Sequence, residues 1–266
     1  MEDTTRYTLA LDPAVKLRAA LVWARGLPGC PKTEAPPAYL ADLLGRVRAA
    51  GESFLPPERK AAVRDMLRFG KYKPAGRSKP SSEYLLAAAL DGEFPLVNGP
   101  VDANNAISLE WGYPASIFDA AKTGPELFIR RGLAGESYVF NPSGQAIELE
   151  DLLVVCRRAG GENASSGAPA REPGSPTGWE RGSSILWERG SSILWERGSS
   201  ILWEPCGNPV KDAMATKVFE GARDVVAVVY APASEPRVRL EACADRFREL
   251  LATECGAAEA DLSIIP

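Results

Sequence analysis

The chain has 266 residues, of which 45% are hydrophobic and 25% charged, as in an ordinary globular protein with room for one large domain or two small ones. A formal net charge of −4 argues against a general nucleic-acid-binding protein. The sequence contains no histidine, which excludes Ser-His-Asp and Cys-His nucleophiles and histidine-containing metal sites, so any catalysis must use carboxylates, lysine, main-chain donors, substrate groups or positioned water.

The five cysteines are scattered and form no Cys-x-x-Cys pair, so the sequence predicts neither a disulfide framework nor a zinc site. We expect no metal and no cofactor. No apolar run approaches the roughly 18 residues that a membrane helix needs. The first residues are acidic and lack the layout of a signal sequence, so we expect a cytoplasmic protein with no membrane partner.

The first 68 residues are predicted to form an α/β segment packed on the main domain. Residues 15–23 alternate apolar and polar side chains, which is the period of a half-buried strand. Leucines and other apolar residues then recur at helical spacing from Tyr39 to a stop at Gly51. A second helix is expected to begin after Pro57 and to end near Phe69.

Residues 59–79 carry eight basic side chains and a single acid, Asp65, in an otherwise acidic protein. The second half of this segment is broken by glycine and proline and is therefore predicted to be a loop. A basic loop with an aromatic residue, Tyr72, suits phosphate contacts and base stacking. A solvated helix face followed by a polar linker is an equally weighted alternative. The candidate RNA-binding residues are Lys71, Lys73, Arg77 and Lys79, together with Lys211 and Lys217 from a later polar cluster.

Ser81 or Ser82 is predicted to cap a helix that ends before Gly92. The next segment, residues 96–122, concentrates asparagine and short carboxylates beside apolar residues. Asn104, Asn105 or Asp102 would cap a helix that begins near Ile107. That capping uses only one or two of the polar groups, so a polar pocket is favoured over capping alone.

Further along, residues 127–130 and 137–140 are predicted to be strands, and a turn at 141–144 leads into an apolar stretch at 147–155. The β-branched run at 225–231 indicates a buried strand, and residues 239–252 have the spacing of an amphipathic helix. The sequence thus predicts an α+β fold with a C-terminal helix.

Composition changes abruptly at Gly160, and the unit WERGSSIL then occurs three times in succession between Trp179 and Leu202. A period of eight matches neither solenoid repeats nor one face of a helix. Residues 163–202 are predicted to be an insertion in a loop and are expected to be disordered. An interaction arm whose apolar units pair as short strands is the alternative.

Four motifs occur in a specific order: KPAGRSKPSSEYLL, VDANNAISLEWGYPASIFD, GESYVFNPSGQ and PCGNPVKDAMATK. Together they resemble the free-standing relatives of the B3/B4 domain of the phenylalanyl-tRNA synthetase beta subunit. The resemblance covers roughly residues 69–232, interrupted by the insert, and residues 69–266 are taken as the B3/B4-like domain. It implies a three-layer α+β domain with a β-sandwich portion.

In the synthetase, this domain hydrolyses tRNA-Phe that is mischarged with tyrosine. By resemblance, Asn105 matches an asparagine of the family motif and Thr216 is retained. Asn104 stands where threonine is usual, Ser116 where histidine is usual, and Asn208 near a glutamate that contacts the misacylated amino acid. The candidate catalytic residues are Asn105, Asp212 and Thr216, and the candidate pocket residues are Asn104, Glu110, Ser116, Asp119 and Asn208.

We therefore expect a trans-editing deacylase that hydrolyses a misacylated aminoacyl-tRNA with a positioned water molecule. The alternative is a catalytically inactive module that binds RNA or an amino acid. The expected partner is tRNA or aminoacyl-tRNA, and DNA is not expected. The chain has no room for the remaining domains of a synthetase subunit, which excludes an aminoacyl-tRNA ligase.

Overall fold

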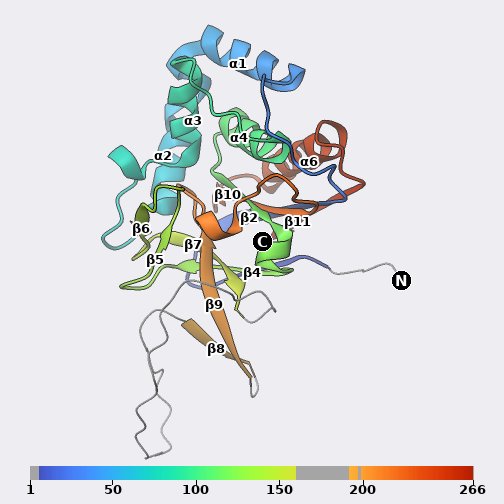
Figure 1. Ribbon diagram of the computed structural model, residues 1–266. Coiled ribbons are helices and arrows are strands. Elements are labelled where there is room, and N and C mark those ends of the chain that lie inside the picture. The colour runs from blue at the N-terminus through green and yellow to red at the C-terminus, as the bar shows by residue number, and fades with distance from the viewer. Residues whose placement is uncertain (1–5, 160–191, 197–198, 266) are drawn as a thin grey trace, which may run out of the picture.

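The computed structural model of the chain describes residues 6–159, 192–196 and 199–265 (Figure 1). The strands are β1 (Thr8–Leu11), β2 (Leu17–Arg25), β3 (Ala115–Asp119), β4 (Glu126–Arg131), β5 (Ser137–Val139), β6 (Ala146–Glu148), β7 (Leu153–Arg158), β8 (Ser192–Glu196), β9 (Ser199–Gly207), β10 (Val225–Pro232) and β11 (Glu259–Ile265). The helices are α1 (Ala38–Ala50), α2 (Pro57–Leu67), α3 (Ser81–Leu90), α4 (Gly99–Trp111), α5 (Ala120–Thr123) and α6 (Arg237–Thr253). Short 3₁₀ turns occur at η1 (Gly51–Phe54), η2 (Gly76–Ser78) and η3 (Met214–Thr216).

A four-stranded antiparallel sheet with the order β11-β2-β10-β3 forms the centre of the molecule. Every residue of β10 is buried, which accounts for its uninterrupted β-branched sequence. Strand β2, from the N-terminal segment, pairs with β10 on one side and with β11 on the other. Residues 6–68 and the later part of the chain therefore share one hydrophobic core.

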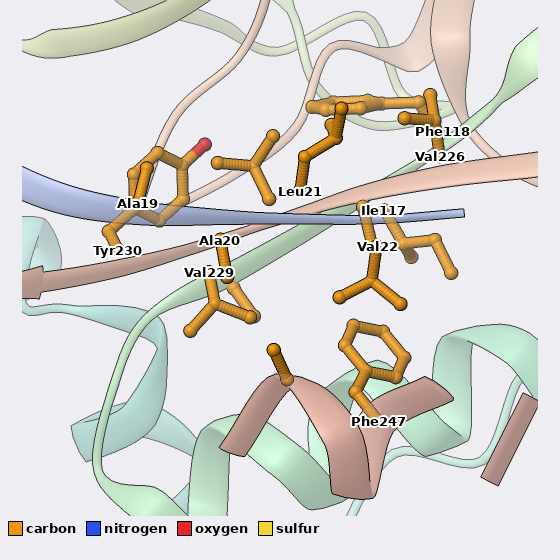
Figure 2. Close-up of a cluster of buried hydrophobic side chains, with 14 of the residues drawn as sticks. Ala19, Ala20, Leu21, Val22, Ile117, Phe118, Val226, Val229, Tyr230 and Phe247 are labelled. Atoms are coloured by element: carbon orange, nitrogen blue, oxygen red, sulfur yellow. The ribbon is translucent and has the colours of Figure 1, made fainter. Parts of the chain in front are cut away.

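The two faces of this sheet are covered differently. Figure 2 shows Ala20, Val22 and Val229 on the face toward Phe247 of α6, while Leu21 and Tyr230 lie on the opposite face. Helices α4 and α6 cover the first face, since α6 contacts β2 and β11, and α4 contacts α6 and β3. Alternation of side chains across a strand thus gives the sheet two apolar faces.

A second sheet packs against the opposite face. Its strand order is β1-β4-β7-β9-β8, with β1 parallel to β4 and the other pairs antiparallel. Ile129 of β4 and Val155 of β7 belong to the same buried cluster as the four-stranded sheet. The fold is therefore α+β, with two sheets in a sandwich-like arrangement and helices on one outer face.

Helices α1 and α3 pack with α4 around a second, smaller apolar cluster that includes Leu40, Leu43, Leu85 and Leu109. This cluster fixes α4 from the side away from α6. None of the described helices is long and apolar enough to cross a membrane.

Most elements agree with the sequence predictions, including β2, β4, β5, β10, α1, α2 and α6. Two predictions of helix caps were wrong. Helix α4 begins at Gly99 with Asn98 as its N-cap, so Asn104 and Asn105 lie within the helix rather than at its start. Helix α3 follows Pro80 and has no side-chain cap, so Ser81 and Ser82 are not caps. Strands β1 and β11 were not predicted, and the stretch expected from residue 147 divides into β6 and β7.

Within the expected insert, β8 and the first residues of β9 pair as antiparallel strands, with Ile193 opposite Leu202. Strand β7 pairs with β9, and Arg158 lies opposite Trp203, so the segments flanking the insert lie side by side. Residues 163–191 and 197–198, which were also predicted to be disordered, lie outside the described residues.

Candidate functional site

A cavity of about 220 Å³ lies between α4, the edge strand β3 and the 208–219 loop. One wall is aliphatic and is formed by Val101, Ala115, Ile117 and Val218. The polar residues of the lining are Ser81, Asn104, Asn105, Asn208, Lys211, Asp212 and Lys217. An apolar cavity with a few polar groups is the usual form of a ligand site.

Helix α4 brings Asn104 and Asn105 to this cavity. The helix starts at Asn98, whose Oδ1 accepts a hydrogen bond from the main-chain N–H of Val101 at 3.2 Å. It ends at Gly112, which adopts the left-handed conformation with φ of 73° that favours glycine. Between these ends, both asparagines lie in the helix interior and line the cavity.

Asn104 is only 5% exposed and is incompletely hydrogen-bonded. Its Nδ2 donates to the main-chain oxygen of Ala115 at 3.3 Å, but its Oδ1 has no partner among the described residues. A buried acceptor left unpaired costs roughly 1–3 kcal/mol. Asn105 is half-buried and makes no hydrogen bond through its side chain within the described residues.

Asn208 shapes the loop that forms the opposite wall. Its Oδ1 accepts hydrogen bonds from the main-chain N–H groups of Val210 (2.8 Å) and Lys211 (2.9 Å). Its Nδ2 donates to Tyr138 Oη, and that hydroxyl donates to the main-chain oxygen of Lys211 at 2.7 Å. Asn208 lines the cavity as predicted, but its amide is committed to holding the loop.

Asp212 is the carboxylate of the cavity. Burial raises the pKa of this group to about 7, although the nearby Ser116 hydroxyl, main-chain N–H groups and the charge of Lys217 act in the opposite direction. Its Oδ1 is covered and has no partner among the described residues. A carboxyl group with a pKa near 7 exchanges protons readily at neutral pH, which suits general acid–base chemistry.

Gly207, which lies against the Asp212 side chain, has no room for a Cβ atom. A Cβ atom at Gly207 would lie 2.6 Å from Asp212 Oδ1 and 2.4 Å from Cε1 of Phe118. Strand β9 can therefore approach both side chains only because position 207 has no side chain.

Four predicted site residues lie outside the cavity lining. Ser116 is buried behind it, where its Oγ accepts a hydrogen bond from Tyr230 Oη at 3.0 Å and donates to the main-chain oxygen of Asn208 at 3.3 Å. The hydroxyl of Thr216 donates to the main-chain oxygen of Cys206 at 2.9 Å and is 1% exposed. Thr216 thus secures a turn and does not line the cavity.

The two downstream carboxylates likewise have structural partners. Glu110 pairs with Arg46 at 2.7 Å on the outer side of α4. Asp119 accepts a hydrogen bond from the main-chain N–H of Ala121 at 3.1 Å and pairs with Lys122 at 2.9 Å. Both carboxylates are therefore paired with cations outside the cavity lining.

The predicted cations divide into two groups. Lys73, Arg77 and Lys79 are exposed and make no ion pair in the part of the chain that the structure describes. Lys71, by contrast, pairs with Glu150 at 2.8 Å. The basic loop leads directly into Ser81, a cavity residue whose main-chain N–H donates to the oxygen of Pro209 at 2.9 Å, so loop and cavity are adjacent.

Two further lysines lie at the cavity itself. Lys211 is exposed, and its Nζ lies 4.0 Å from the ring centre of Phe140. Lys217 is half-buried, and burial lowers its pKa. The cavity is thus bordered by positive charge on two sides.

Sequence reasoning missed Tyr138 and Tyr230, which hold Asn208 and Ser116 in place. Burial raises the pKa of both phenols well above the usual value, so both remain donors at neutral pH. The position of Tyr138 within the GESYVF motif was the only available signal.

Among the described residues, no group of three or more cysteine, aspartate or glutamate side chains is arranged to hold a metal ion. No protein-family model matches the chain, and no curated protein matches it.

Proposed function

We propose that this protein binds the 3′ end of an aminoacylated RNA and hydrolyses the ester bond to the amino acid, as a free-standing editing deacylase of the B3/B4 type. The observation that carries the proposal is the cavity, which combines an aliphatic wall with Asp212, a half-buried carboxyl group whose pKa is about 7. A cytoplasmic location, where aminoacyl-tRNA is abundant, belongs to the same proposal.

The RNA contacts come from the free cations beside the cavity. Lys73, Arg77 and Lys79 are exposed on the loop that leads to Ser81, and Lys211, which is also exposed, lines the cavity. Phosphate groups are neutralised by such lysines and arginines, and this contribution to affinity decreases as salt concentration increases. Because the protein as a whole carries a net charge of −4, we attribute RNA affinity to these local cations rather than to the overall charge.

The chemical step uses Asp212 as general base. Its carboxylate takes one proton from a water molecule as the water oxygen bonds to the carbonyl carbon of the ester. The tetrahedral intermediate then breaks its C–O bond to the ribose, and the carboxylic acid of Asp212 returns the proton to the leaving ribose oxygen. The products are the free amino acid and an RNA with a free terminal hydroxyl, and no histidine is required.

A binding module without hydrolysis is the second candidate. Thr216 and Asn208, both expected in the site, have their polar groups committed to structural hydrogen bonds. Of these three residues, only Asp212 would then be available for proton transfer. The cavity could in that case bind a ligand without hydrolysing it.

The experiment is deacylation of a panel of aminoacyl-tRNAs, led by Tyr-tRNA-Phe, by the wild type, Asp212→Asn and Glu220→Gln. Asp212→Asn keeps the shape of the side chain but cannot act as a base, and a loss of at least about 100-fold in rate is expected. Glu220 is an exposed carboxylate of the same loop region, so Glu220→Gln controls for net charge. Equal rates for Asp212→Asn and the wild type would disprove the role of Asp212.

RNA binding is measured separately by titration at increasing salt. Replacing Lys73, Arg77 and Lys79 together with glutamine should weaken binding and reduce the slope of log affinity against log salt by about two to three. RNA binding without deacylation on the whole panel would favour the binding module.

A further inference from the structure

The cavity contains an amide oxygen that the protein leaves without a donor. Asn104 is 5% exposed, and its Nδ2 donates to the main-chain oxygen of Ala115 at 3.3 Å. Because a carbonyl oxygen can only accept, this contact fixes which end of the amide is nitrogen. Oδ1 is therefore the end with no partner among the described residues.

No donor of the described residues forms a hydrogen bond with this oxygen. Val101, Ala115 and Ile117 form the adjacent wall with aliphatic side chains. The amide of Asn208 is used by the main chain of its own loop and by Tyr138. Asn105, one residue further along α4, is half-buried and so retains access to water, whereas Oδ1 of Asn104 is covered.

We infer that Asn104 determines specificity, with its Oδ1 accepting a hydrogen bond from a hydroxyl or N–H group on the side chain of the bound amino acid. The inference deepens the proposed function and rests on it for the choice of an amino acid as ligand. The aliphatic wall contacts the hydrocarbon part of that side chain. Discrimination follows because only a ligand that carries the donor provides a hydrogen bond to Oδ1, which is otherwise unpaired.

The size of the cavity fits this class of ligand. At about 220 Å³ it is larger than the roughly 150 Å³ cavities that accommodate benzene, so a single amino-acid side chain fits. Volume does not separate threonine from valine, which have nearly the same shape. A preference between two such isosteric ligands therefore reports hydrogen bonding alone.

The test compares L-threonine with its isostere L-valine, and L-tyrosine with L-phenylalanine, which lacks only the hydroxyl, by calorimetric titration of the full-length protein. The wild type should bind the hydroxyl-bearing member of a pair at least about tenfold more tightly, as expected for pairing one buried acceptor. In Asn104→Leu, which has a similar volume and no acceptor, this ratio should fall to about one or below. Glu220→Gln, a change at an exposed residue outside the cavity lining, should keep the wild-type ratio.

Equal affinities within both pairs for the wild type would overturn the inference, and this result does not depend on whether Asn104→Leu folds. An unchanged ratio in a folded Asn104→Leu would also overturn it, because the acceptor would then lie elsewhere.

Rates for the same four amino acids esterified to tRNA separate this inference from the deacylase proposal. Equal binding within the pairs together with equal hydrolysis would overturn the inference and leave the deacylase intact. A threonine or tyrosine preference in binding without any hydrolysis would support the inference and contradict the deacylase. If none of the four amino acids binds and none of the esters is hydrolysed, both are overturned.

Discussion

Asn98 donates a hydrogen bond from Nδ2 to the main-chain oxygen of Val218 at 3.1 Å, while its Oδ1 caps helix α4 through the N–H of Val101. One side chain thus joins the start of the helix that carries Asn104 to the loop that carries Asp212. The two walls of the cavity are held together by a contact between residues 120 positions apart.

Asn98→Ala should therefore destabilise the protein more than loss of a helix cap alone. Loss of the cap costs about 1 kcal/mol, and the buried oxygen of Val218 loses its donor, so we expect about 2–3 kcal/mol in total. Chemical denaturation measures this change. Asn105→Ala, on the same helix but without a side-chain hydrogen bond to the described residues, should change the free energy of unfolding by less than about 0.5 kcal/mol. Similar values for the two variants would contradict the bridging role.

Gly207→Ala should disturb the cavity because the new Cβ would overlap Phe118 and Asp212 Oδ1. Overpacking of a core of this kind costs about 1–3 kcal/mol. Gly45→Ala is the matched control, since Gly45 lies within α1 and a Cβ there meets nothing within 4 Å. The control should be neutral or stabilising by up to about 1 kcal/mol. Thermal denaturation of both variants gives the comparison, and equal melting temperatures would refute the close approach at position 207.

The ion pair of Arg130 with Glu136 is almost completely buried, and both guanidinium nitrogens contact the carboxylate, at 2.7 and 2.6 Å. Arg130→Met should cost about 3–5 kcal/mol, because it leaves Glu136 buried and unpaired. Arg158→Met, which breaks an exposed pair with Glu126, should cost less than about 1 kcal/mol. Urea denaturation distinguishes the two cases. A small effect of Arg130→Met would mean that water reaches Glu136.

Asp212 also predicts a pH dependence of stability. Its pKa rises from 3.8 in the unfolded chain to about 7 in the folded protein, so the folded state holds the proton more tightly. The protonated carboxyl group therefore adds its full contribution to the free energy of unfolding below pH 3.8. This contribution is lost as pH rises toward 7, at up to about 1.4 kcal/mol per pH unit. Above that range, ionisation of Asp212 no longer changes the free energy of unfolding.

The measurement is the difference in unfolding free energy between the wild type and Asp212→Asn from pH 5 to pH 8. Asparagine does not titrate, so the variant should gain relative stability as pH rises and then reach a plateau. The neighbouring groups Tyr138, Tyr230 and Cys206 have raised pKa values and stay neutral in this range. A difference that is independent of pH would show that Asp212 has an ordinary pKa.

The sequence predicted the elements with strong periodicity but not the contacts that organise the site. The β-branched run of β10 and the leucine spacing of α1 identified those elements, since burial alone dictates such patterns. Strand β11 was missed because its residues are only partly buried at the sheet edge and give no clear alternation. The start of α4 was misplaced because Asn98, Asp102, Asn104 and Asn105 are all acceptable caps, and only tertiary contacts select Asn98.

The candidate site was predicted in part. The concentration of amides at 98–105 indicated a polar pocket, and Asn104, Asn105, Asn208 and Asp212 do line one cavity. Which of these amides has a free hydrogen-bonding group depends on partners distant in sequence, such as Ala115 and Tyr138. A single sequence carries no information on those pairings.

The most direct test of the central proposal is the pH dependence of single-turnover deacylation of an aminoacyl-tRNA that the wild type hydrolyses. If Asp212 is the general base, the rate should rise with pH through an inflection near 7 and then level off, and Asp212→Asn should remove this inflection together with most of the rate. A wild type that hydrolyses no member of the panel, or an Asp212→Asn variant that keeps the same inflection and rate, would contradict the proposed function.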